Sequence, residues 1–176
     1  MLFRSNRLVF EGGMVSVEPI ALDPAFKEEL GRRIVVCYTG TSRVSSKTIA
    51  RVMGAYGRGE TEVTDALRSL AEVAERMAGA LRAGDLPRMA ELLTENWRHQ
   101  QRLDRGMCTP EMARLEAGMR AAGALGGKAA GAGAGGSMFF VAGDDPEPAA
   151  RAAREAGARV LPFAWAARGV TVEAGA

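Results

Sequence analysis

A glycine-rich segment is the part of this sequence best suited to chemistry. Residues 123–136 read Gly-Ala-Leu-Gly-Gly-Lys-Ala-Ala-Gly-Ala-Gly-Ala-Gly-Gly, with one charged side chain, Lys128. A backbone without side chains can pass close to a ligand or to another loop, where any Cβ would intrude. The composition predicts such a close approach, although by composition alone the segment could also be a flexible linker.

Two phosphate-binding patterns match this segment in part and fail. Residues 131–136 spell Gly-x-Gly-x-x-Gly, but a dinucleotide-binding loop needs a strand before it and a helix after it. Here the predicted order is reversed. Residues 123–128 superficially resemble a P-loop, but only three residues separate the first glycine from the one before Lys128. Ala129 also stands where a magnesium-binding Ser or Thr belongs.

Three helices are predicted before the glycine-rich segment. Apolar residues recur at three- and four-residue steps over 63–81, 86–97 and 112–119. Gly84-Asp85 ends the first helix and caps the second, and Thr109-Pro110 opens the third. The short connections between these helices favour antiparallel packing.

Strands flank this helical region on both sides. Alternating apolar residues around Glu11-Gly12-Gly13 predict a hairpin over 6–18. A helix capped by Asp23, a buried strand and a helix that Ser45 or Ser46 can cap follow, over 24–30, 33–38 and up to about 56. After the glycines we expect a strand, a helix and two strands, over 138–142, 146–156, 159–164 and 169–173. This order, without a βαβ repeat, predicts an α+β fold with a mainly antiparallel sheet.

Composition and charge narrow the class of protein. The chain has 176 residues, 47% of them hydrophobic, and a net charge of +2. So small a charge gives no reason to expect a nucleic-acid partner. No run of about 18 apolar residues suggests a membrane span, and we expect a soluble, cytoplasmic protein. Cys37 and Cys108 are expected to be free thiols, and with one histidine they cannot form a usual structural zinc site.

Several motifs in order resemble the GHMP kinase family, and within it the bacterial D-glycero-D-manno-heptose 7-phosphate kinases. Lys128-Ala-Ala-Gly131-Ala-Gly133-Ala-Gly135-Gly136 is similar to the family's third motif, a glycine-rich loop leading into a strand. Tyr38-Thr-Gly-Thr-Ser-Arg43 resembles the strand-end motif of the heptose kinases, and so do Asn96-Trp97 and Gly106-Met-Cys-Thr-Pro110. The resemblance covers about 6–172.

The resemblance implies a ferredoxin-like α+β fold with a packed helical layer and transfer of the ATP γ-phosphoryl group to a sugar hydroxyl. It implies that residues 23–176 form the C-terminal domain and that 1–22 are strands of the N-terminal half. The family's nucleotide loop, its Mg²⁺-binding acid and the acid acting on the sugar hydroxyl lie in that half. We therefore expect a truncated chain with little or no kinase activity alone, and self-association through the surface left uncovered.

The same resemblance assigns the candidate site residues. Gly131, Gly133, Gly135 and Gly136 would shape the backbone near the nucleotide, Lys128 and Arg43 would hold substrate phosphate, and no catalytic or metal-binding residue is assigned to this chain. The family loop usually has four consecutive glycines, whereas Ala134 interrupts them here, and Ser137 replaces an apolar residue. A left-handed backbone at Ala134 would cost roughly 1 kcal/mol.

Other polar and aromatic residues have simpler interpretations. Thr39 and Ser42 are expected to cap the following helix, and Trp97, in register with Leu93, is expected in the core. His99 has no visible catalytic partner. The alternative functions are a non-catalytic α+β domain that binds a ligand or another subunit, and a purely structural dimer.

Overall fold

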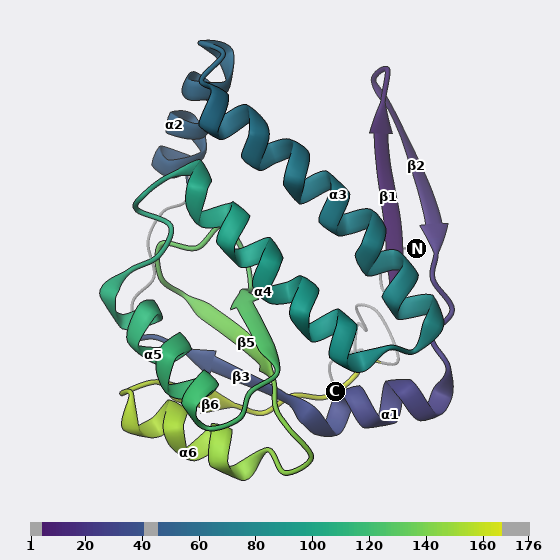
Figure 1. The fold of residues 1–176 in the computed structure, drawn as a ribbon, viewed down its shortest axis with the longest axis vertical. Helices are drawn as coiled ribbons and strands as arrows, with labels where there is room; N and C mark the ends of the chain where they lie inside the picture. The colour runs from purple at the N-terminus through teal and green to yellow at the C-terminus, as the bar shows by residue number, and fades with distance from the viewer. Residues whose placement is uncertain (1–4, 41–45, 167–176) are drawn as a thin grey trace, which may run out of the picture.

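The computed structural model describes residues 5–40 and 46–166 (Figure 1). Its strands are β1 (Asn6–Glu11), β2 (Met14–Pro19), β3 (Ile34–Tyr38), β4 (Gly126–Ala129), β5 (Ser137–Val141) and β6 (Arg159–Leu161). Its helices are α1 (Pro24–Arg33), α2 (Ser46–Gly57), α3 (Thr61–Ala83), α4 (Leu86–Leu103), α5 (Pro110–Ala121) and α6 (Glu147–Glu155). None of the helices in these ranges is long and apolar enough to cross a membrane.

A four-stranded antiparallel sheet organises the chain. Its strand order is β4-β5-β3-β6, and every neighbouring pair is antiparallel. The first two of its strands in the chain are separated by helices α2 to α5, and the last two by α6. The predicted ferredoxin-like α+β fold is confirmed.

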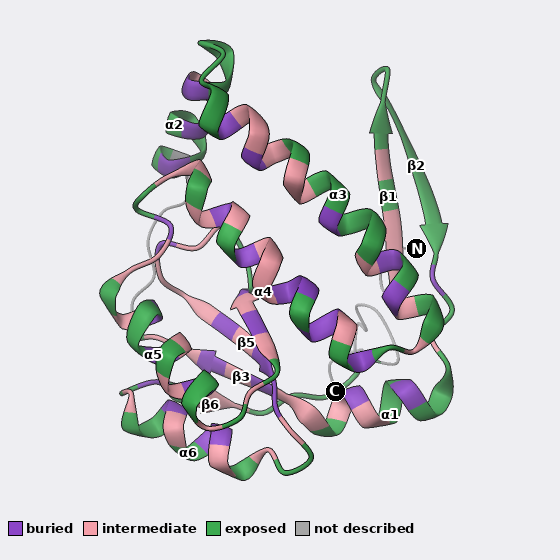
Figure 2. Ribbon diagram, viewed as in Figure 1, coloured by how far each residue is buried: buried purple, intermediate pink, exposed green. Residues whose placement is uncertain are grey.

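Helices cover the sheet unequally. Alternate residues of β3 and β5, among them Cys37 and Phe140, form one buried cluster with α5 and α6. A second cluster joins α1, α3 and α4 around Leu92 and includes Val141 at the end of β5. Figure 2 shows that buried positions concentrate where α4, α5 and α6 meet the sheet. The residues of β3 and β5 on the opposite face, such as Val36 and Phe139, are only partly buried.

Helices α1, α4 and α5 begin, and α3 ends, where the capping residues predict. Asp23 accepts hydrogen bonds from the backbone N–H of Ala25 and Phe26, Asp85 from Arg88, and Thr109 from Met112. Each satisfies N–H groups that a helix N-terminus leaves without an internal partner. Gly84 adopts the left-handed conformation that ends α3.

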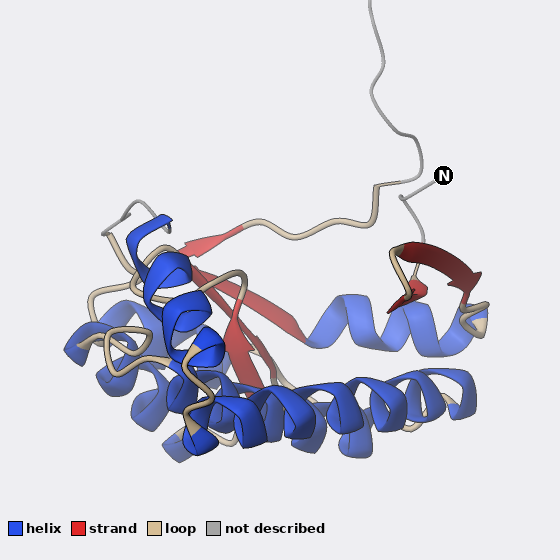
Figure 3. Ribbon diagram, turned by 90° about the horizontal axis from the view of Figure 1, so that it is seen from above, coloured by secondary structure: helices blue, strands red, loops and turns tan. Residues whose placement is uncertain are grey.

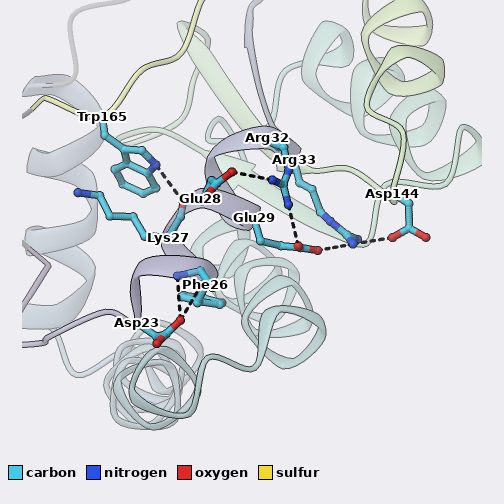
Figure 4. A network of polar contacts seen from close by, with 10 residues as sticks. Asp23, Phe26, Lys27, Glu28, Glu29, Arg32, Arg33, Asp144 and Trp165 are labelled. Atoms are coloured by element: carbon cyan, nitrogen blue, oxygen red, sulfur yellow. Dashed lines mark hydrogen bonds and ion pairs between the residues drawn. The ribbon is translucent and has the colours of Figure 1, made fainter.

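Polar contacts join helix α1 to the segments that follow β5 and β6 (Figure 4). Arg33, in its last turn, pairs with Glu29 and with Asp144 in the connection that follows β5. The Trp165 indole N–H donates to the Lys27 carbonyl oxygen at 3.1 Å. The segment after β6 therefore crosses back to α1, where Gly31 leaves room for the indole ring.

The hairpin β1–β2 stands apart from the sheet. Its register pairs Arg7 with Glu18 on one face, and these side chains form ion pairs with Glu75 and Arg82 of α3. The opposite face carries apolar side chains with exposed fractions between 43% and 73%: Leu8, Phe10, Val15 and Val17. The hairpin therefore binds α3 through polar contacts and leaves its apolar face uncovered by the described residues.

Three elements differ from the sequence-based expectations. Strand β4 forms inside the glycine-rich segment, where only a loop was predicted. Helix α1 runs to Arg33, three residues further than expected, and β6 has three residues instead of six. The strand expected over 169–173 lies outside the described residues.

Candidate functional site

The glycine-rich loop over 130–136 is held in place by several parts of the fold. The Gln100 side-chain amide donates to the Gly131 carbonyl oxygen at 2.7 Å. The Ala134 N–H donates to the Met107 carbonyl oxygen at 2.6 Å. The Gly136 carbonyl oxygen accepts from the backbone N–H of Thr39 at 2.9 Å and from its hydroxyl at 2.8 Å. These contacts from α4, the α4–α5 connection and the end of β3 rule out a flexible linker.

The backbone of this loop needs glycine for two separate reasons. Residues 133–136 all have positive φ angles, of 78° at Gly133, 63° at Ala134, 114° at Gly135 and 80° at Gly136. In addition, a Cβ on Gly133 would lie 2.5 Å from the Met107 carbonyl oxygen. Ala134 thus occupies the left-handed conformation whose cost for a non-glycine residue is about 1–2 kcal/mol.

The first half of the segment needs glycine because the backbone of α4 and the ring of Phe140 lie against it. A Cβ on Gly126 would lie 1.9 Å from the carbonyl oxygen of Ala90 on α4. A Cβ on Gly127 would lie 2.2 Å from the Phe140 ring. At these two positions the close approach predicted from composition is therefore to α4 and to β5. Strand β4 packs against α4 and pairs with β5.

Lys128 lies on β4 between these glycines and the loop. Its ammonium donates to the carbonyl oxygen of the next residue, Ala129, at 2.9 Å. Among the described residues it makes no ion pair with a carboxylate, and burial lowers the pKa of its side chain. A partly buried ammonium without an anionic partner is poised to accept one.

Two cavities lie along the α3–α4 pair. One, of about 300 Å³, is lined by Lys128, by the hairpin and by α3 and α4. The other, of about 370 Å³, is lined by α2, by α3 and α4, and by Met107 and Ala132 beside the glycine loop. Asn96 of α4 lines both. Seen from above, α2 and the hairpin lie toward opposite ends of the α3–α4 pair and on the same side of it (Figure 3).

The strand-end motif is only partly described. Thr39 lies directly beside the glycine loop, so the fold brings together two segments that are almost a hundred residues apart. The expectation that Thr39 caps the next helix is wrong, because its hydroxyl donates to Gly136 and α2 begins only at Ser46. Arg43 and Ser42 lie outside the described residues.

The structural interpretations of Trp97 and the cysteines agree with the packing. Trp97 is fully buried, and its indole N–H donates to Glu116 at 3.0 Å. Among the described residues, His99 has its polar contacts with Arg102 and Glu95, both on its own helix. Both cysteines are free thiols; Cys37 is buried and Cys108 is half-buried. Over the described ranges, no group of three or more His, Cys, Asp or Glu side chains could hold a metal ion.

Sequence reasoning missed Gln100, which positions the loop. Gln100 follows Leu93 and Trp97 at helical spacing, and it is buried. A polar residue on an apolar stripe needs a partner when it is buried. That break in the stripe was the available signal, although only the fold identifies Gly131 as its partner.

Comparison with known proteins matches this domain to one family. Residues 77–160, from within α3 to β6, match the family model described as GHMP kinases C terminal. The chain is also 29% identical over 126 residues to the D-glycero-alpha-D-manno-heptose 7-phosphate kinase of Campylobacter jejuni, covering 72% of this chain and 37% of that protein.

Solved structures share the fold. A putative sugar kinase from Campylobacter jejuni aligns with a TM-score of 0.64 and 25% identity over 93% of this chain and 46% of its own. The mevalonate kinase of L. major in complex with R-mevalonate aligns with a TM-score of 0.71 and 21% identity, over 85% and 44% of the two chains. The chain thus spans less than half the length of these relatives.

The matched region contains most of the sheet, the glycine loop and the helices that hold the loop in place. Over residues 77–160 the chain is therefore similar to the C-terminal domain of the GHMP kinases.

Proposed function

We propose that the chain is the C-terminal part of an ATP-dependent sugar kinase whose substrate resembles heptose 7-phosphate. Residues 1–22 would belong to the N-terminal half and 23–176 to the C-terminal domain. The similarity to the Campylobacter jejuni heptose kinase supports the substrate class. The observation that carries the proposal is the clamped glycine loop beside the end of β3.

The glycine loop suits the phosphate end of a nucleotide. Phosphoryl transfer depends mainly on positioning and on neutralising charge spread over the transferred group. A loop held by Gln100, Met107 and Thr39 offers a fixed backbone, and Gly131 has open space where a Cβ would be. We assign Gly131, Gly133, Gly135 and Gly136 to this contact.

Lys128 suits the phosphate of the sugar. Its ammonium is partly desolvated and forms no ion pair within the described residues, so a dianionic phosphate would supply the charge that the site lacks. Arg43, which follows the loop-contacting Thr39 by four residues, is the second candidate for the same phosphate.

The nucleotide would bring Mg²⁺ with it. The ion would neutralise charge that develops on the transferred phosphoryl group. The described residues offer no cluster of ligands for it, so we assign the ion to the part of the kinase that the longer relatives carry. For the same reason we expect this chain alone to have little or no activity.

Calorimetry with ATP and with heptose 7-phosphate tests the proposal, on this chain alone and with the N-terminal half of a homologous heptose kinase added. Binding of ATP and release of ADP only in the mixture would support it, whichever sample binds the sugar phosphate. Tight ATP binding by the chain alone would mean that the nucleotide site is misplaced. Absence of binding in both samples would favour the alternative, a non-catalytic α+β domain.

The uncovered face of the hairpin supports self-association as a second proposal. Exposed contiguous apolar patches on soluble domains usually mark interaction sites, and Phe10 is 73% exposed. We expect sedimentation velocity to show a dimer or larger species at micromolar concentration. Phe10→Ser with Val15→Ser should shift it to monomer, whereas Val9→Ser, on the face toward α3, serves as a control. A strictly monomeric wild-type chain would refute this proposal.

A further inference from the structure

The side-chain amide of Asn96 lies in a partly enclosed position beside two cavities. It lies on α4, is partly buried and lines both cavities along the α3–α4 pair. Within the described residues its side chain makes no hydrogen bond. An amide side chain carries two N–H donors and one carbonyl acceptor, so Asn96 presents unused hydrogen-bonding groups to both cavities.

The neighbours of Asn96 make this position unusual. One turn before it on α4 lies Leu93, and one turn after it lies Gln100, both buried. Leu70 of α3 and Leu103 line the adjoining cavity, whose wall is largely apolar. Gln100 is already committed to Gly131. Asn96 is therefore a polar group on a largely apolar wall, and its amide is still reached by solvent and so is available to a ligand.

The charges around the cavity lined by Lys128 indicate which kind of group a ligand would place there. Arg7 and Glu75 both line this cavity, but they pair with each other at 2.7 Å. Of the charged side chains that line this cavity, Lys128 is the one without an ion pair among the described residues, and it is positive. A ligand that fits must combine an anionic group with neutral hydrogen-bonding groups a short distance away.

We propose that Asn96 is a specificity-determining residue that hydrogen-bonds a hydroxyl group of a sugar phosphate, while Lys128 binds its phosphate. The inference rests on the proposed function and adds to it one contact residue and the orientation of the bound ligand. The phosphate lies toward the hairpin, and the sugar ring extends along α4 toward the glycine loop. Cavities of about 300 and 370 Å³ are of the size that small-molecule ligands occupy.

Titration calorimetry on the chain alone tests the assignment, with inorganic phosphate, D-mannose and D-mannose 6-phosphate as probes. Wild type should bind the sugar phosphate more tightly than phosphate. Asn96→Ala should weaken D-mannose 6-phosphate binding about three- to tenfold, the effect of one neutral hydrogen bond, and leave phosphate binding unchanged. Lys128→Gln should weaken both.

Gln101→Ala is the matched control, because Gln101 lies on the same helix but lines a different cavity. It should leave binding of all three probes unchanged, and circular dichroism should show that every variant is folded. The inference is overturned if Asn96→Ala binds D-mannose 6-phosphate like wild type, if it weakens phosphate equally, or if wild type binds neither anion.

The outcomes separate this inference from the proposed kinase function. Sugar phosphate binding that depends on Asn96, without ADP release in the mixture with an N-terminal half, would retain the inference and reject the kinase. If instead the mixture releases ADP and Asn96→Ala leaves the KM for the sugar phosphate unchanged, the kinase function is retained and the inference about Asn96 is rejected.

Discussion

Gly126→Ala is the most direct test of the backbone contact between β4 and α4. The added methyl carbon would lie 1.9 Å from the Ala90 carbonyl oxygen, 2.5 Å from its carbon and 2.8 Å from the Thr94 hydroxyl oxygen. The shortest of these is about 1.5 Å inside the 3.4 Å at which ordinary contact begins. The nearest atoms are backbone, so no side-chain rotation can relieve the overlap.

The expected cost follows from the rigidity of both partners. Overpacking a well-packed interior costs about 1–3 kcal/mol and occasionally more, and an overlap with helix backbone belongs at the upper end. For a chain of this size, each 1 kcal/mol lowers Tm by about 2–4 °C. We therefore expect Gly126→Ala to lower Tm by about 6–12 °C, if β4 stays paired with β5.

Thermal and urea unfolding followed by circular dichroism measure this change. Gly131→Ala is the control, because a Cβ there meets nothing within 4 Å and its φ is not positive; away from such contacts substitutions stay within about 0.5 kcal/mol. If Gly126→Ala and Gly131→Ala unfold at the same temperature, the direct contact of α4 with β4 is refuted, and with it the explanation of why the segment contains glycine here.

Three further predictions concern the loop, the C-terminal crossing and a buried thiol. Ala134→Gly should raise the free energy of unfolding by up to about 1 kcal/mol, because relief of the left-handed strain exceeds the extra freedom of glycine in the unfolded chain; a loss of stability in urea unfolding would contradict the strain. Gly31→Ala should displace Trp165, since the new Cβ would lie 2.6 Å from its indole nitrogen, and the tryptophan emission should shift to the red; an unchanged spectrum would refute that packing. Burial raises the pKa of the Cys37 thiol to about 11, from 9.0 in its absence. The contribution of this thiol to the free energy of unfolding should therefore be fully present below pH 9 and be lost as the pH rises toward 11, since the unfolded chain loses the proton first. In urea titrations across that range, Cys37→Ala should lose less stability than wild type.

The sequence by itself determined the local elements. Proline and capping residues such as Asp23 and Asp85 act on N–H groups two or three residues away, so the starts of α1 and α4 can be read from neighbouring residues. The pair Gly12-Gly13 sets the hairpin turn in the same way. The periodicity of α3 and α4 predicts which faces are buried, because a helix places residues three and four apart on one side.

Only the tertiary structure decided what the glycines do. The sequence indicated a close approach, but the partners of Gly126 and Gly133 are Ala90 and Met107, which local rules cannot connect to them. Strand β4 was missed because glycine disfavours strands by its own propensity, and this strand exists through its pairing with β5 and its contact with α4.

The candidate site shows the same division between local and distant contacts. Lys128 and the loop glycines stand out by residue type, whereas Gln100, Asn96 and the hydroxyl of Thr39 acquire a role only from where the fold places them. Thr39 was assigned to a helix cap because the sequence shows near neighbours alone. Its partner, Gly136, is distant in the chain and reaches it only because β3 and β5 pair in the sheet. Backbone propensity and capping act over a few residues, while hydrogen bonds and close packing between distant segments depend on a topology that the residues specify only together.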